Sequence, residues 1–299
     1  MDIGAIVAAL RERLESMLAS PRGRYRPLAV DGEPVGWLDD RRARRLAGFM
    51  DVFTVNERQL TFVPALATPA QRTLALKRVA RTLAREGLLT AWRNEHYAVA
   101  AKPGGPSLFE IERAAARYFG VHTFAAHVNG LVHAGDGTRM WLARRSPRKA
   151  IDPGLLDNLV GGGIAAGTSV KATLVKEAWE EAGVAAAMAA TARSLGAVHV
   201  CRAQYDGLQR ETIFVHDLWL EADFVPACQD GEAVDHRLVA LVEAAKLAAN
   251  RDWPDVVTAD ASLVIVDCLI RHGLIAADSP DFAALSALRY PALEVVASS

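Results

Sequence analysis

Three glutamates, Glu177, Glu180 and Glu181, follow one another at the spacing of a single helix face. At about 100° per residue they fall within roughly one third of the circumference of a helix, so their carboxylates lie close together. Clustered carboxylates repel one another unless a cation lies between them, and oxygen-only ligands suit Mg²⁺ or Mn²⁺. The spacing therefore predicts a divalent-metal site, and a solvated acidic face is the alternative for this pattern.

A glycine-rich stretch, GGGIAAG at residues 161–167, precedes the acidic helix. Thr168 or Ser169 can accept a hydrogen bond from the first turn of the helix, and Gly183 suits its left-handed end. We expect an apolar stripe opposite the glutamates to pack on a core, formed by Ala172, Val175, Ala178, Trp179 and Ala182. The segment is thus predicted to be a glycine loop followed by an amphipathic helix.

The segment 162–184 resembles the signature of the Nudix hydrolases. The positions in register with that signature are Gly162, Glu177, Ala178, Glu180, Glu181, Gly183 and Val184. Thr168 stands where the family has Glu, and Lys176 stands where it has Arg, which implies loss of an ion pair that braces the loop. The resemblance implies that Glu177, Glu180 and Glu181 hold Mg²⁺ or Mn²⁺. It also implies cleavage of a small-molecule diphosphate.

The resemblance extends beyond this box to most of the chain. Segments such as DGEPVGWL, LDNLVGGGIAAG and ASLVIVDCLIRHGLI are similar to the two-domain Nudix proteins related to the Nudix half of fungal thiamin pyrophosphokinase. That similarity implies an N-terminal domain of unknown role. It further implies pyrophosphatase action on thiamin diphosphate or its oxidised analogues.

A diphosphate must be neutralised before water attacks phosphorus, and a bound metal ion does this while lowering the pKa of its water. Further groups that suit this chemistry lie near the glutamates. The candidates for binding the substrate are Arg144, Arg145, Lys149, Gly162 and Gly163. Glu232, in an acidic loop with Asp230 and Asp235, is the candidate for a further ligand or general base, and Glu211 is the reserve.

Aromatic and other reactive side chains give weaker indications. Trp141, Trp219 and Trp253 are candidates for stacking on a flat substrate, and a place in the core is the alternative for each. The eight histidines lack the spacing of a zinc site, and no serine stands in a Gly-x-Ser-x-Gly elbow. Direct attack by water is therefore the simplest mechanism.

Composition limits the class of protein. The 299 residues are 51% hydrophobic, which is enough for two domains with buried cores. A net charge of -1 and a pI near 6.7 argue against nucleic acid as a partner. Three scattered cysteines give no disulfide framework, and the sequence shows neither a signal peptide nor an apolar run of spanning length. We expect a cytoplasmic protein with no membrane partner, and the sequence is compatible with a homodimer.

The order of predicted elements indicates an α/β (α+β) fold in two parts. Residues 1–120 are expected to form a smaller N-terminal α+β domain, with helices at 5–18, 40–47, 69–87 and 108–119. Residues 121–299 are expected to form the Nudix domain, an α/β/α sandwich with a mixed sheet. Its strands lie at 122–133 and 138–146, its long hairpin turns at 206–207, and its last strong helix covers 258–271.

Three other functions stay open at this stage. The changes at Thr168 and Lys176 are compatible with a catalytically silent Nudix-like sensor that binds a ligand without cleaving it. A hydrolase of nucleoside-diphosphate sugars or dinucleotides would use the same glutamates. An isomerase of isoprenyl diphosphates on this fold would need a paired cysteine and acid, and the sequence shows no such pair.

Overall fold

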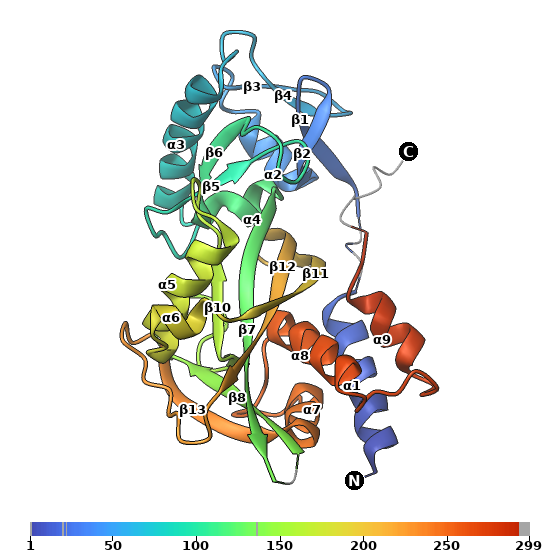
Figure 1. The fold of residues 1–299 in the computed structure, drawn as a ribbon. Coiled ribbons are helices and arrows are strands. Elements are labelled where there is room, and N and C mark those ends of the chain that lie inside the picture. Colours follow the sequence, from blue (N-terminus) through green and yellow to red (C-terminus); the bar gives the residue numbers. More distant parts are fainter. Residues whose placement is uncertain (1, 20, 22, 136, 293–299) are drawn as a thin grey trace.

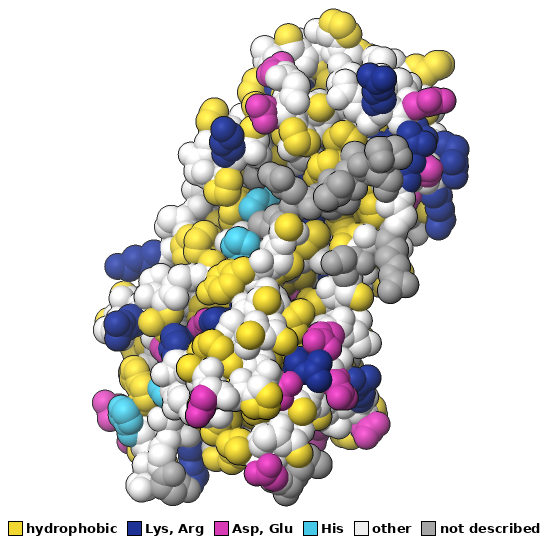
Figure 2. Space-filling view, turned by 90° about the vertical axis from the view of Figure 1, so that its right-hand side faces the viewer, with side chains coloured by type: hydrophobic (Ala, Val, Ile, Leu, Met, Phe, Trp, Pro, Cys, Tyr) yellow, Lys and Arg dark blue, Asp and Glu magenta, His cyan; other side chains and the backbone are white. Residues whose placement is uncertain are grey.

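The computed structural model describes residues 2–19, 21, 23–135 and 137–292, arranged as two bodies one above the other (Figure 1). The upper body carries β1 to β6, and the lower body carries β7 to β13. Basic and acidic side chains are interspersed with hydrophobic ones on the face that carries α9 (Figure 2). Within the described ranges, none of the helices combines the length and hydrophobicity needed to cross a membrane.

The upper body is built on a four-stranded sheet in the order β2-β1-β4-β3. Its strands are Tyr25–Val30 (β1), Glu33–Asp39 (β2), Phe53–Val55 (β3) and Leu60–Phe62 (β4). Helix Asp40–Leu46 (α2) packs against this sheet, and helix Pro69–Arg85 (α3) joins the same hydrophobic core. A capping box begins α3, in which the Thr68 hydroxyl and the Gln71 side chain each bond the backbone of the other.

The helix predicted over residues 108–119 is wrong for its first half. Residues Phe109–Glu112 form strand β6, which pairs with His96–Val99 (β5), and a short turn Arg113–Ala115 (η1) leads into the single helical turn Ala116–Phe119 (α4). Phe109 and Ile111 are buried whereas Glu110 between them is exposed, which is the period of a strand. A four-residue alternation is too short to be recognised beside the helical pattern that follows it.

The lower body contains a seven-stranded mixed sheet. The main path runs β11-β12-β7-β8-β13, with β10 paired to β7 and β9 paired to β8. The strands are His122–Ala134 (β7), Gly137–Arg145 (β8), Leu156–Asn158 (β9), Val160–Gly163 (β10), Arg193–Gln204 (β11), Gly207–Leu220 (β12) and Ala233–Ala240 (β13). Strands β7 and β12 run parallel, and β11 and β12 form the predicted antiparallel hairpin. The connection between the predicted strands 122–133 and 138–146 includes residue 136, which lies outside the described residues.

Helices cover both faces of this sheet, as predicted for an α/β/α sandwich. On one face lie Val170–Ala182 (α5) and Ala186–Ala189 (α6); on the other lie Ile3–Met17 (α1), Leu241–Ala249 (α7), Ala259–Arg271 (α8) and Phe282–Leu288 (α9). Along β7, Ala125 and Leu131 pack toward α1 and α8, whereas Ala126 and Val132 pack toward α5. This alternation buries the sheet on both sides.

Helix α1 packs on the lower body although it begins the chain. Its residues Leu10 and Leu14 are fully buried among α7, α8 and α9. Arg13 is also buried, and its guanidinium donates hydrogen bonds to the carbonyl oxygens of Ala248 and Val257. The first helix therefore anchors the N-terminal part to the sandwich, and the division at residues 120 and 121 stays a prediction.

Candidate active site

The glycine loop and the helix that follows it have the predicted caps. Helix α5 begins after Ser169, whose hydroxyl accepts a hydrogen bond from the backbone amide of Ala172 at 3.1 Å. The helix ends at Gly183, which has a left-handed φ of 66°. The Thr168 hydroxyl donates to the carbonyl oxygen of Ala165 at 2.6 Å and so closes the loop on itself.

The predicted apolar stripe of α5 is only partly correct. Ala178 and Ala182 are buried in the core, but Ala172 is exposed and Trp179 has an exposed fraction of 51%. The packed face is turned toward Leu174 and Glu181, because the helix lies against β7 and β10 on that side. One of the three glutamates is therefore part of the buried face rather than of an open acidic surface.

Glu181 is the most enclosed of the three glutamates. Its residue exposure is 9%, and its Oε2 accepts a hydrogen bond from the backbone amide of Gly161 at 2.8 Å. Burial raises the pKa of Glu181 to about 8, opposed by the Gly161 amide and by the charge of Lys149. A buried carboxyl group fits a site that accepts a cation, because a bound cation would stabilise its charged form.

Glu177 and Glu180 share one cation, whereas the carboxylate oxygens of Glu177, Glu180 and Glu181 do not all lie within 4.8 Å of one another. The ammonium of Lys176 lies 3.0 Å from Oε1 of Glu177 and 2.6 Å from Oε2 of Glu180, so a positive charge already stands between the two carboxylates. Burial lowers the pKa of Lys176, but the hydrogen bonds that its ammonium donates to Glu180 and Glu177 and the charges of these carboxylates outweigh burial, so the pKa is raised. The chemistry of the donor set fits a divalent cation, because three carboxylates from one helix offer only oxygen donors.

Gly162 and Gly163 allow the loop backbone to lie close to the side chains of Glu177 and Tyr97. A Cβ atom on Gly162 would lie 2.3 Å from Cγ of Glu177, and one on Gly163 would lie 2.1 Å from Oη of Tyr97. Tyr97 belongs to β5 in the upper body, and the next part of the loop is bonded there as well, because the Ala166 amide donates to the carbonyl oxygen of His96 at 2.7 Å. The glycine loop therefore contacts Glu177 of α5 on one side and the N-terminal part on the other.

A cavity of about 740 Å³ lies between the two bodies, beside the glycine loop. From the lower body it is lined by Glu177, Glu180, Arg145, Lys149, Glu211 and Glu232, and from the upper body by Arg93, Tyr97, Arg113 and Arg117. This volume is typical of a pocket for a small organic molecule, and it exceeds what a diphosphate group alone would fill.

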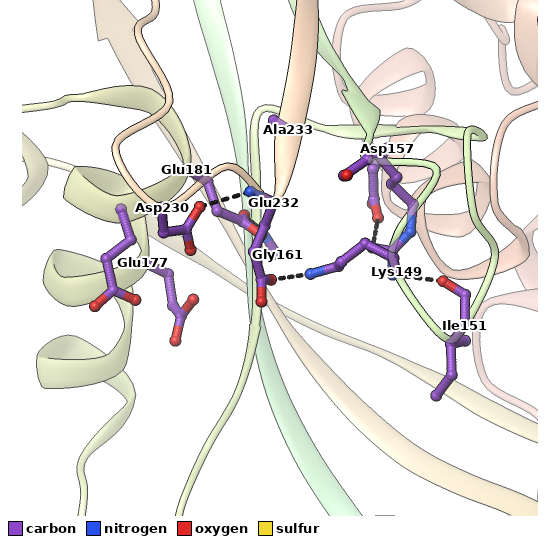
Figure 3. Close-up of polar contacts among 12 residues, drawn as sticks. Lys149, Ile151, Asp157, Gly161, Glu177, Glu181, Asp230, Glu232 and Ala233 are labelled. Atoms are coloured by element: carbon purple, nitrogen blue, oxygen red, sulfur yellow. Dashed lines mark hydrogen bonds and ion pairs between the residues drawn. The ribbon is translucent and has the colours of Figure 1, made fainter. Parts of the chain in front are cut away.

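The structure brings two of the three predicted basic residues to this cavity. Arg145 is held by the carbonyl oxygen of Ile151 at 2.8 Å and by the carboxylate of Asp157 at 2.8 Å. Lys149 contacts the carboxylate of Glu232 (Figure 3). Arg144 does not line the cavity; its guanidinium donates to the carbonyl oxygens of Gly154 and Pro254 instead.

Among the predicted loop acids, Glu232 and Asp230 lie at the cavity. Glu232 reaches toward Lys149 from the segment before β13, with Asp230 beside it, on the side of the cavity where α5 presents Glu177 (Figure 3). The Glu232 amide donates to Oδ1 of Asp230 at 2.8 Å, which fixes this segment. Glu211 also lines the cavity and accepts a hydrogen bond from Thr123 at 3.0 Å, whereas Asp235 pairs with Arg237 elsewhere.

None of the three tryptophans considered for stacking is among the described residues that line the cavity. Trp141 is buried in the core beneath α5, Trp219 stacks on His133 with ring centroids 3.9 Å apart, and Trp253 lies over Gly154. Among the described residues that line the cavity, Tyr97 is the one phenylalanine, tyrosine or tryptophan, and the sequence did not single it out.

The residues of the upper body that reach the cavity were missed from the sequence. Arg93, Tyr97 and Arg113 lie 64 or more positions before Glu177 in the sequence, and only the docking of the two bodies brings them to the cavity. The one local signal is the mixture of charged and aromatic residues in WRNEHY at positions 92–97, directly before a strand.

Comparison with known proteins agrees with this arrangement. Residues 123–260 match the family model of the NUDIX domain, and residues 8–123 match a domain of unknown function, DUF4743. Nudix hydrolase 24, chloroplastic, of Arabidopsis thaliana is 37% identical over 262 residues, covering 87% of this chain and 71% of that protein. Nudix hydrolase 20, chloroplastic, of the same plant is 35% identical over 269 residues, with the same coverage of both chains.

A solved structure, DR0079 from Deinococcus radiodurans, aligns with 50% of this chain and 83% of its own at 21% identity, with a TM-score of 0.38. The family assignment depends on the relatives and not on this likeness. The chain belongs to the Nudix hydrolases, and it is a hydrolase that acts on pyrophosphate bonds. Members of this family generally use divalent metal ions, and the three α5 glutamates supply the oxygen ligands that such ions prefer.

Proposed function

We propose that this protein is a Mg²⁺-dependent pyrophosphohydrolase that cleaves a substituted diphosphate into two monophosphates, with Mn²⁺ as an alternative ion. The main support is that Glu177 and Glu180 of α5 and the cations Arg145 and Lys149 line one cavity, with Glu181 buried on the same helix. Negative ligands for a metal ion and positive ligands for phosphate oxygens are thus presented to the same small molecule.

Each side chain has a distinct task in this proposal. Glu177, Glu180 and Glu181 would hold the metal ion, which when bound supplies charge neutralisation and lowers the pKa of a water molecule. Lys149 and Arg145 orient the diphosphate, and Arg145 is kept in place by Asp157. Glu232 receives the proton of the attacking water, since it lies at the cavity beside Lys149.

The substrate is proposed to be thiamin diphosphate or one of its oxidised analogues. The support is the sequence resemblance across both domains, together with a cavity larger than a diphosphate and the ring of Tyr97 on its wall. A hydrolase of nucleoside-diphosphate sugars or dinucleotides is the second candidate, because the same cavity volume would accept those molecules.

A silent ligand sensor is the rival of a different class. It is favoured by one observation: the Lys176 ammonium bonds two of the proposed metal ligands, Glu177 and Glu180. If that ammonium were not displaced by a metal ion, the site would bind diphosphates without cleaving them.

A hydrolysis panel separates these possibilities. Thiamin diphosphate, its oxidised analogues, ADP-ribose, dinucleoside polyphosphates and NADH are incubated with Mg²⁺, and the products are identified by mass. The variant Glu180→Gln/Glu181→Gln should lose activity by on the order of a hundredfold or more. The matched control Glu243→Gln, an exposed glutamate of α7 paired with Lys246, should keep it. Full activity in the double variant would refute the proposal, and tight binding without turnover across the panel would favour the sensor.

We further propose that the protein is cytoplasmic and that it forms a homodimer. Cell fractionation and the mass of the protein in solution would test them.

A further inference from the structure

Arg93 lies in a short segment of the N-terminal part whose backbone is constrained. Ala91 and Asn94, on either side of it, have left-handed φ values of 61° and 57°, which non-glycine residues adopt only where their surroundings demand it. The Arg93 amide donates to Oε1 of the buried Glu112 at 3.0 Å, and the Trp92 indole donates to Oδ1 of Asn94 at 2.8 Å. This segment holds its shape through specific contacts.

The Arg93 side chain crosses from the upper body to the lower one. Its Nη1 lies 2.8 Å from Oε1 of Glu232, and the ammonium of Lys149 contacts the other carboxylate oxygen, Oε2. Both oxygens of Glu232 are therefore bound by cations, one from each body. The side chain of Glu232 is 24% exposed and that of Arg93 is 40% exposed, so the cluster is open to molecules in the cavity.

Arg93, Lys149 and Glu232 all line the cavity that also receives Glu177 and Glu180. A diphosphate that enters this cavity carries several negatively charged acceptor oxygens. Guanidinium and ammonium donors bind phosphate and carboxylate oxygens by the same geometry, so the substrate and Glu232 compete for the same two cations.

We propose that Arg93 is a diphosphate-binding residue supplied by the N-terminal domain. The substrate takes over Arg93 and Lys149 from the Glu232 carboxylate, and that carboxylate becomes free to act as a base. This last part depends on the proposed hydrolase function: water oxygen bonds to phosphorus, its proton passes to Glu232, and the bridging P–O bond breaks with its electron pair staying on the leaving phosphate. The domain of unknown function thereby completes the substrate site.

Binding measured without metal and without hydrolysis tests this exchange. Methylenediphosphonate, a diphosphate that cannot be hydrolysed, is titrated calorimetrically into the full chain in EDTA. Arg93→Gln should weaken its binding by on the order of 10- to 100-fold, because a charge-assisted contact is lost. Arg93→Lys should fall between the two, since it keeps the charge and loses the fork. The matched control Arg78→Gln removes an exposed arginine of α3 that pairs with Asp51, and it should bind like the wild type.

Glu232→Gln is the sharper test because it is expected to tighten the binding of the probe, whereas the Arg93 variants are expected to weaken it. Removing the carboxylate that competes for Arg93 and Lys149 should tighten the binding of methylenediphosphonate by a few-fold, even while hydrolysis falls. EDTA excludes any effect of Glu232 on a metal ion. Arg93→Lys serves as the test of the arginine if Arg93→Gln does not fold.

Three outcomes would overturn the inference: wild-type affinity in both Arg93 variants, weaker binding in Glu232→Gln, or no binding of the probe by the wild type. The outcome is separate from that of the hydrolysis panel. If the panel finds no substrate but the binding order is as expected, the proposed activity fails and the role of Arg93 stands. If the panel finds a substrate but the binding order is not as expected, the proposed activity stands and the role of Arg93 fails.

Discussion

Replacing Gly163 with alanine tests how closely the N-terminal part is seated on the glycine loop. The new Cβ would lie 2.1 Å from Oη of Tyr97 and 3.0 Å from Cζ of the same ring, so the ring must move. Gly163 is not in the left-handed region, so the expected cost is steric and not a matter of backbone strain. Overpacking of this kind lowers the free energy of unfolding by about 1–3 kcal/mol.

Tyr97→Phe should relieve part of this cost. It removes the atom at 2.1 Å and leaves the ring carbon at 3.0 Å as the nearest neighbour, which is a tight but tolerable contact. The double variant Gly163→Ala/Tyr97→Phe should therefore be more stable than the sum of the single changes predicts, by about 0.5–1 kcal/mol or more. Gly135→Ala is the control, because no atom lies within 4 Å of the position of its Cβ.

Urea unfolding of the wild type, the two single variants, the double variant and the control measures these free energies. Gly163→Ala should also raise KM, since Tyr97 lines the cavity. Strict additivity of the two changes, or a Gly163→Ala variant as stable as Gly135→Ala, would show that Tyr97 is not packed on the loop as described.

Two further predictions concern charge. Burial, with Arg210 nearby, lowers the pKa of His122 to about 4 from an ordinary 6.5. The neutral ring is favoured in the fold, so its contribution is complete above pH 6.5 and is lost as the pH falls toward 4. His122→Asn should remove up to about 3 kcal/mol of that acid-induced loss, and an unchanged pH dependence of urea unfolding would count against it. Lys176→Gln should tighten Mn²⁺ binding by roughly 2- to 5-fold in an electron paramagnetic resonance titration, because the ammonium bonds Glu177 and Glu180. The exposed Lys171→Gln is its control, and weaker binding in Lys176→Gln would contradict the competition.

The loop-helix unit could be predicted because its determinants are local. Ser169 and Gly183 sit at the two ends of α5 and fix its length by capping, and the glutamates between them keep helical spacing in any environment. The order of strands and helices in the lower body was also readable, since its longest strands, β7 and β12, are continuous runs that are buried along most of their length.

What the sequence did not reveal depends on contacts between distant segments. The burial of Glu181 and the exposure of Trp179 follow from how α5 is rotated against β10, which helical periodicity alone leaves undetermined. The role of Tyr97 and Arg93 follows from the docking of the upper body. Arg144 and Arg145 are adjacent on strand β8, so their side chains leave on opposite sides and only Arg145 reaches the cavity. That distinction was available from strand geometry.

We propose above that Glu177, Glu180 and Glu181 together hold a divalent cation next to the phosphoanhydride bond of the substrate. The most direct measurement is an anomalous difference map from crystals soaked with Mn²⁺. A peak at roughly 2.0–2.2 Å from carboxylate oxygens of these glutamates, absent in Glu180→Gln/Glu181→Gln crystals, is the predicted result. Mn²⁺ bound elsewhere, with Lys176 still joined to Glu177 and Glu180, would contradict it.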